Sequence, residues 1–162
     1  MKTIKASWIL AVFVLLTGSQ FTMAQKTNLP EMKPLTWEIG YASGINDVPA
    51  QWYPATVPGA VQLDLAKALK YGIYFYAENW KDYLWMEDQY FTYRTSFNKP
   101  AIGENQKCYF ISKGIDYEFE ILLNGEKILH QEGMFTHVKL DLNSSLKDKN
   151  EALIKGYLMN TL

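Results

Sequence analysis

The sequence predicts an all-β fold, an antiparallel sandwich that carries one short helix. Three observations support this class. From Leu35 onward, short apolar or alternating segments are separated by turn residues, which is the spacing of a sandwich. The segment FEILLNGEKIL, residues 119–129, alternates apolar and polar residues up to an Asn-Gly pair. Residues 61–69 follow a turn and have apolar residues at four-residue intervals, and they are the one segment that combines both features of a helix.

The first 24 residues have the composition of a secretory signal peptide. Lys2 and Lys5 give a positive start, and an uninterrupted apolar run extends from Trp8 to Leu16. This run is shorter than the about 20 residues that span a bilayer. We therefore expect cleavage after Ala24 and a secreted or periplasmic product with no membrane partner.

The rest of the chain is expected to form a flexible lead-in, residues 25–34, and one β-sandwich domain, residues 35–162. Removal of Lys2 and Lys5 takes the formal net charge from −1 to −3, which gives no reason to expect nucleic acid as a partner. No GxGxxG or P-loop arrangement occurs, so no cofactor is expected. Cys108 is the single cysteine, which excludes an internal disulfide and predicts a buried, inert thiol.

Each predicted element has its own signal. Asn124 and Gly125 supply the positive φ angles of a type I′ turn, and the two glutamates that alternate with Phe119 and Ile121 are expected to face solvent or a partner domain. The helix is expected to run from just after Gly59 to about residue 71, with a stop at residue 72. Strands are expected over residues 35–39, 51–56, 89–97, 107–112, 117–123, 127–131, 135–140 and 152–157.

The order of several short motifs is typical of one known family. The matching residues are Trp52, Ala55, Val57, Pro58, Gly59, Val61, Asp64 and Leu65, then Trp85, Tyr93, Arg94 and Phe97, then Gly114, Ile115, Asp116, Asn124, Gly125, Gly133, Met134 and Phe135, and finally Asp141, Leu146 and Asn150. In this order they resemble the amino-terminal sugar-binding-type domain of β-mannosidases of glycoside hydrolase family two, over about residues 35–150. The resemblance implies a galactose-binding-domain-like jelly roll.

The resemblance also implies a function. Intact relatives remove terminal β-linked mannose from glycans, and their two catalytic glutamates lie in a barrel that follows this domain. The carboxyl groups of such a retaining pair stand about 5 to 5.5 Å apart. No catalytic residue is therefore carried over to this chain, its substrate-binding residues stay unknown, and the fragment alone is expected to be inactive. The implied partners are the C-terminal catalytic barrel of the same protein and mannose-containing glycans.

Three alternatives stay open. The chain could be a free-standing carbohydrate-binding module, or a fragment of another family-two glycosidase of the β-galactosidase or β-glucuronidase type. It could also be a truncated remnant that does not fold stably. One departure from the family motivates the last alternative: the closing segment EALIKGYLMNTL contains a glycine, which weakens a strand. A second departure, the run GIYFYAENW without the proline usual there, leaves the path of that loop open.

The acidic residues suggest no active site of their own. Asp116, Glu118 and Glu120 alternate along one expected strand face, which is typical of a solvated or interdomain surface. Neighbouring Glu87 and Asp88 would point apart in a strand. His130 and His137 have no partner at a spacing that indicates a triad or a metal cluster, so no metal site is expected.

Arg94 lies on an aromatic-rich expected strand. We expect it to pair with a carboxylate such as Asp116 or to stack on a ring. Aromatic residues crowd the segment before and around it, which indicates either core and interdomain packing or, less favoured, a carbohydrate platform. They are Tyr74, Phe75, Tyr76, Trp80, Tyr83, Trp85, Tyr90, Phe91 and Tyr93.

Overall fold

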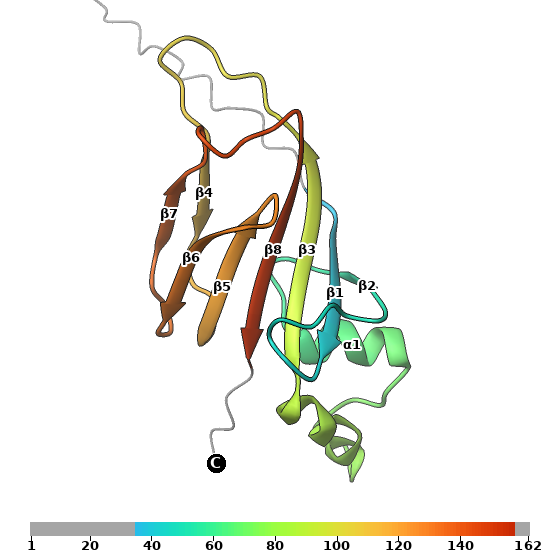
Figure 1. The fold of residues 1–162 in the computed structure, drawn as a ribbon. Helices are drawn as coiled ribbons and strands as arrows, with labels where there is room; N and C mark the ends of the chain where they lie inside the picture. The colour runs from blue at the N-terminus through green and yellow to red at the C-terminus, as the bar shows by residue number, and fades with distance from the viewer. Residues whose placement is uncertain (1–34, 158–162) are drawn as a thin grey trace, which may run out of the picture. The chain divides into compact units, whose positions relative to one another are not determined.

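The computed structural model describes residues 35–157 and shows a two-layer antiparallel β-sandwich (Figure 1). The larger layer is a six-stranded sheet in the order β2-β1-β3-β8-β5-β6, and a smaller sheet pairs β4 with β7. The predicted all-β sandwich is thus confirmed. The predicted signal peptide over residues 1–24 and the lead-in over residues 25–34 lie outside the described residues.

Every predicted strand is present, with shifted ends. The strands are β1 (Trp37–Ala42), β2 (Tyr53–Ala55), β3 (Tyr90–Asn98), β4 (Tyr109–Ser112), β5 (Glu118–Leu123), β6 (Glu126–Glu132), β7 (Val138–Asp141) and β8 (Lys149–Tyr157). Two helical elements accompany them, α1 (Val61–Leu69) and η1 (Asn79–Asp88), a 3₁₀ segment. Among the described residues, no helix is long and apolar enough to cross a bilayer.

The predicted α-helix is accompanied by a second helical segment that the sequence analysis did not foresee. The sequence NWKDYLWMED has only a weak helical period, and it turns as a 3₁₀ helix that buries Tyr83 and Met86. The end of α1 was also placed too late. Lys70, with φ 60°, takes the left-handed position after Leu69, and the Tyr71 N–H closes the helix by donating to the Ala66 carbonyl at 2.9 Å.

The closing strand is complete within the described residues. β8 begins at Lys149, three residues before its predicted start, and lies between β3 and β5 in the middle of the large sheet. Gly156 is opposite both Phe91 and Phe119. The ladder on both sides compensates the weak strand propensity of this glycine.

The predicted start of the strand over residues 135–140 was wrong. Phe135 has φ 59° and its side chain is 85% exposed, so it forms part of a turn before β7. The predicted hairpin, in contrast, is confirmed. Asn124 and Gly125 have φ angles of 54° and 86° between β5 and β6, as a type I′ turn requires.

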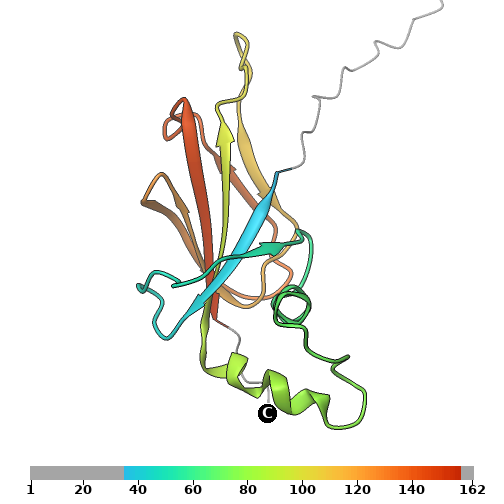
Figure 2. The same ribbon diagram turned by 90° about the vertical axis from the view of Figure 1, so that its right-hand side faces the viewer.

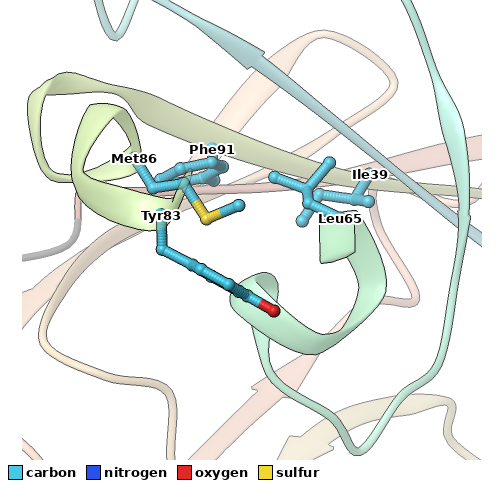
Figure 3. Packing of buried hydrophobic residues seen from close by; sticks show 5 residues of the cluster. All are labelled: Ile39, Leu65, Tyr83, Met86 and Phe91. Carbon is cyan, nitrogen blue, oxygen red and sulfur yellow. The ribbon is translucent and has the colours of Figure 1, made fainter. Parts of the chain in front are cut away.

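The inner face of the large sheet is covered by two different layers. At one end, α1 and η1 pack against it, as Figure 2 shows from the side. The buried cluster there joins Ile39 of β1, Leu65 of α1, Tyr83 and Met86 of η1 and Phe91 of β3 (Figure 3). Full burial of side chains of this size contributes about 1.5–3 kcal/mol each.

The β4–β7 sheet covers the other part of the same face. Phe119 and Ile121 of β5 are buried against Val138 of β7, with Phe110 and Leu140 packed around them. The half of the sandwich that contains β4 and β7 therefore has its own buried core, which is built on the same large sheet.

The loop over residues 43–51 lies on the opposite, outer face. A Cβ atom at Gly40 would stand 2.5 Å from the Pro49 Cβ and 2.9 Å from the Gln51 carbonyl oxygen. The Lys155 ammonium donates to the Ile45 carbonyl at 2.9 Å. Glycine at position 40 thus lets the loop approach the sheet closely.

Candidate interaction surface

The aromatic segment separates into two groups. Tyr83 and Phe91 are buried, and Trp85 and Tyr93 pack against the same core. Four further rings, from the loop before η1 and its first turn, are exposed: Tyr74 by 54%, Phe75 by 87%, Tyr76 by 71% and Trp80 by 42%. Tyr90, at the start of β3, is half-buried and belongs to neither group. The favoured prediction was core and interdomain packing, and its core part accounts for the first group.

Further apolar side chains continue the exposed group. Leu63 of α1 is 70% exposed, Ile73 of the loop 64% and Leu84 of η1 45%. We call these seven residues, Leu63, Ile73, Tyr74, Phe75, Tyr76, Trp80 and Leu84, the aromatic surface. A groove between α1 and η1 runs through it and is lined by six of them. Exposed apolar patches of this kind mark interaction sites on soluble proteins.

Internal hydrogen bonds fix the loop that carries the surface. The Tyr83 hydroxyl donates to the Gly72 carbonyl at 2.7 Å. The Asn79 side-chain amide donates to the Ile73 carbonyl at 2.9 Å. Tyr83 also makes an edge contact with the Tyr74 ring, with centroids 5.1 Å apart. The exposed rings are therefore held on a shaped platform.

Asp64 fastens the helix beneath this platform. Its carboxylate is buried and accepts the Thr56 backbone N–H at 3.1 and 3.2 Å, and it also accepts the Tyr93 hydroxyl at 3.3 Å. Burial, followed by the nearby Asp64 charge and hydrogen bond, raises the pKa of the Tyr93 phenol. The motif residue Asp64 thus has a structural role, linking β2, α1 and β3.

Arg94 pairs with a residue other than the predicted one. Its Nε donates to the Glu38 Oε2 at 2.7 Å across the β1–β3 ladder, and its guanidinium lies 3.9 Å from the centroid of the Trp52 ring. The predicted ring stacking is confirmed. The suggested partner Asp116 was wrong, because it lies before β5, two strands away from β3.

On the outer face of β5 and β6, acidic and histidine side chains that are apart in the sequence lie close together. In the β5–β6 register, Glu120 lies opposite His130 and Glu118 opposite Glu132. One ligand atom from each of Glu118, His130 and Glu132 lies within 4.8 Å of the others. His130 and Glu132 are exposed, and this cluster stands on the outer face of the sheet. Its charges are solvated there, with Lys127 paired to Glu120.

The other candidate side chains form no cluster of catalytic or metal-binding groups among the described residues. Glu87 and Asp88 are exposed at the end of η1, and His137 is exposed before β7. Cys108 is partly buried beside the core that contains Leu123. Burial raises the pKa of its thiol, with a smaller contribution from the Asp141 charge, which agrees with the predicted inert cysteine.

The fold and these landmarks define a galactose-binding-like β-sandwich domain. Residues 37–156 match the family of glycosyl hydrolase 2 galactose-binding domain-like domains, and the chain belongs to this family. The predicted resemblance to the amino-terminal domain of β-mannosidases is confirmed.

Similar proteins agree with this placement. Mouse β-mannosidase is 32% identical over 116 residues, which are 71% of this chain and 13% of the mouse protein. β-Mannosidase B of Aspergillus flavus is 26% identical over 75% of this chain and 15% of its own length. The chain thus spans about 15% of the length of the curated relatives it matches.

Solved structures give the same result. The crystal structure of the β-D-mannosidase of Dictyoglomus thermophilum superposes with a TM-score of 0.65 at 27% identity, over 75% of this chain and 15% of that one. A β-glucuronidase of Ruminococcus gnavus, at 21% identity and a TM-score of 0.52 over 74% of this chain and 19% of that one, shares the fold.

Proposed function

We propose that this chain is the non-catalytic amino-terminal domain of a secreted or periplasmic β-mannosidase, whose complete polypeptide removes terminal β-linked mannose from glycans. One observation carries the proposal: the sequence relatives described above are β-mannosidases and reach 32% identity, whereas the likeness to the glucuronidase at 21% is one of fold. The domain's own role is to support the catalytic part of that polypeptide.

The site supports a scaffold better than an enzyme. Glu118 and Glu132 bring one carboxylate oxygen each to within 4.8 Å of the other. They stand on an outer sheet face, where water surrounds the exposed Glu132. A glycosidase needs a pocket that raises the pKa of one carboxyl group. The reaction is therefore assigned to residues outside this domain.

The test uses the longer polypeptide encoded by the same gene. Purified enzyme is assayed with aryl β-mannoside, β-galactoside and β-glucuronide at equal concentration. We expect kcat/KM for the mannoside to exceed the other two by at least about a hundredfold, which is the discrimination that pocket contacts to sugar hydroxyls supply. A preference for galactoside or glucuronide would overturn the mannosidase assignment and favour the corresponding family-two enzyme.

The localisation is tested separately. Expression of the gene in its native host, followed by mass spectrometry of the mature amino terminus, should find Gln25 as the first residue. An intact terminus on a protein retained in the cytoplasm would contradict the predicted export.

A second candidate function is a free-standing carbohydrate-binding module. The exposed rings of Phe75 and Trp80 favour it, because sugars bind by laying their apolar faces on such rings. Sugar hydroxyls also need polar partners in the site. Two polar side chains close to these rings in the chain, Asn79 and Tyr83, already bond the loop backbone, so the scaffold role is favoured.

A further inference from the structure

We infer that the aromatic surface is the docking site for the part of the polypeptide that follows β8. This inference rests on the proposed function and adds the identity of the face through which the domain supports its catalytic partner. Four features of the described residues carry it: the composition of the surface, its rigidity, its distance from the amino-terminal entry and its position at the exit of the chain.

The composition is that of a protein interface. Apolar and aromatic side chains make up most of the groove lining, and Lys67 of α1 and Glu87 at the end of η1 are its charged members. Glu78 and Lys81, on either side of Trp80 in the chain, pair with each other at 2.8 Å. Aromatic anchors accompanied by few charged side chains are typical of interfaces between folded domains.

The surface is shaped in advance of binding. Its loop is held by the bonds from Tyr83 and Asn79 to the backbone, and the Trp85 indole N–H donates to the Tyr71 hydroxyl at 3.1 Å. Less conformational entropy is lost when a preordered loop is buried. This rigidity fits a permanent interdomain contact.

The chain leaves the sheet beside this surface. Tyr157, the last residue of β8, is paired with Tyr90, the first residue of β3. Tyr90 follows the end of η1 at Asp88 by two residues. Figures 1 and 2 both show the end of β8 next to η1. The polypeptide that follows in a longer protein therefore starts next to the end of η1, the helical segment that carries Trp80 and Leu84 of the aromatic surface, at a high effective concentration.

The amino-terminal side of the chain is less favourably placed. β1 begins at Trp37, which is paired with Thr95 near the far end of β3, and it ends at Ala42, which is paired with Tyr90. β1 therefore begins at the end of the sheet away from η1. Since the matched relatives are several times longer than the chain, the following polypeptide is the occupant that the geometry favours.

Cysteine labelling tests the proposed contact. Phe75→Cys is made in the 162-residue chain and in the longer polypeptide encoded by the same gene, and Val48→Cys on the outer-face loop is the matched control, because Val48 is 81% exposed. Maleimide labelling is followed at each cysteine by peptide mass spectrometry. Cys108 stays in place as a slow internal reference. Circular dichroism checks that both variants are folded.

The expected result is local protection. The thiol of the Phe75→Cys variant should react at least about tenfold more slowly in the longer polypeptide than in the isolated chain, because labelling then requires opening of the contact. The thiol of the Val48→Cys variant should react equally in both. Equal rates for Phe75→Cys, equal protection at both positions, or a reading frame that stops after residue 162 would each overturn the inference. Protection that rises with the concentration of the isolated chain would assign the surface to a second copy and also overturn it.

This outcome is separable from the proposed function. A longer polypeptide that hydrolyses the aryl β-mannoside but shows no protection at position 75 would contradict the docking site alone. Protection at position 75 in an enzyme that prefers another glycoside would leave the docking site intact and contradict the mannosidase assignment.

Discussion

Both carboxylate oxygens of Asp64 accept the backbone N–H of Thr56, at 3.1 and 3.2 Å. This contact ties the first turn of α1 to the end of β2, eight positions earlier in the chain. It explains in physical terms why a VPG turn is followed by an Asp-Leu pair: the turn positions the helix, the aspartate locks it and Leu65 enters the core.

Asp64→Ala should therefore destabilise the chain by about 2 to 3 kcal/mol, which is the usual loss for hydrogen bonds to a charged acceptor. Asp64→Asn keeps one acceptor oxygen and nearly the same volume, so its effect should be about half as large. Urea unfolding of the purified chain measures both values. Equal stability of Asp64→Ala and the unsubstituted chain would contradict the structural role of Asp64.

Because the Tyr93 phenol is partly buried beside Asp64, we expect the chain to lose stability at alkaline pH. Burial raises the pKa of its phenol in the folded state above the ordinary value of 10.0, so the folded chain holds this proton when the unfolded chain has released it. The contribution of this phenol to the free energy of unfolding is complete below the pKa that it has in the unfolded chain. It is lost as the pH rises above about 10 toward the higher pKa of the folded state. Unfolding free energies from about pH 8 to about pH 12 should fall less steeply for Tyr93→Phe than for the unsubstituted chain. An equal slope for the two proteins would contradict the partly buried Tyr93 phenol beside Asp64.

The buried Asn150 and the half-buried Asn124 form one polar unit. The Asn124 amide donates to the Asn150 Oδ1 at 3.0 Å and to the Ser145 carbonyl at 2.8 Å, and Asn150 bonds both backbone groups of Lys147. Asn150→Ala should cost about 1 to 3 kcal/mol because it removes the three hydrogen bonds of this buried side chain. Asn124→Gly keeps the positive φ angle of the turn and removes only the side-chain bonds.

A double-mutant cycle measures the coupling between the two asparagines. The double variant should lose less stability than the sum of the single losses, by about 0.5 to 2 kcal/mol. Strict additivity would show that the two side chains act independently and would contradict the network.

Two glycines provide a matched pair of substitutions. Gly40→Ala should destabilise the chain by about 1 to 3 kcal/mol, because the added Cβ would overlap Pro49 and displace the loop. Gly156→Ala meets its nearest atom, the Glu118 carbonyl oxygen, at an ordinary 3.5 Å. Its stability should stay within about 0.5 kcal/mol of the unsubstituted chain or improve. Thermal unfolding of both variants gives the comparison, and equal losses at the two sites would be inconsistent with the close approach at Gly40.

The elements with strong local signals were predictable from sequence. The Asn-Gly turn, the alternation of β5 and the four-residue period of α1 follow from local backbone preferences and burial. The 3₁₀ segment was missed because its stability comes from burying Tyr83 and Met86 under α1, a tertiary effect. The Arg94–Glu38 pair and the His130 cluster depend on strand register, which local sequence does not specify.

The division of the aromatic segment into core and surface was likewise beyond the sequence. Tyr83 and Trp80 are three residues apart in a 3₁₀ helix, and one is buried while the other is 42% exposed. Which rings face outward depends on how η1 rests against α1. The sequence therefore indicated a concentration of aromatic rings, and the fold shows which of these rings are exposed and available to a partner.

Under the proposed function, this domain supports an enzyme and does not bind sugar by itself. Isothermal titration calorimetry of the 162-residue chain with mannose and β-1,4-linked mannobiose tests it most directly. The account predicts no heat beyond dilution up to about 10 mM sugar, near the weakest affinity that such a titration detects. A saturable heat that Trp80→Ala or Phe75→Ala abolishes would contradict it and identify a carbohydrate-binding module.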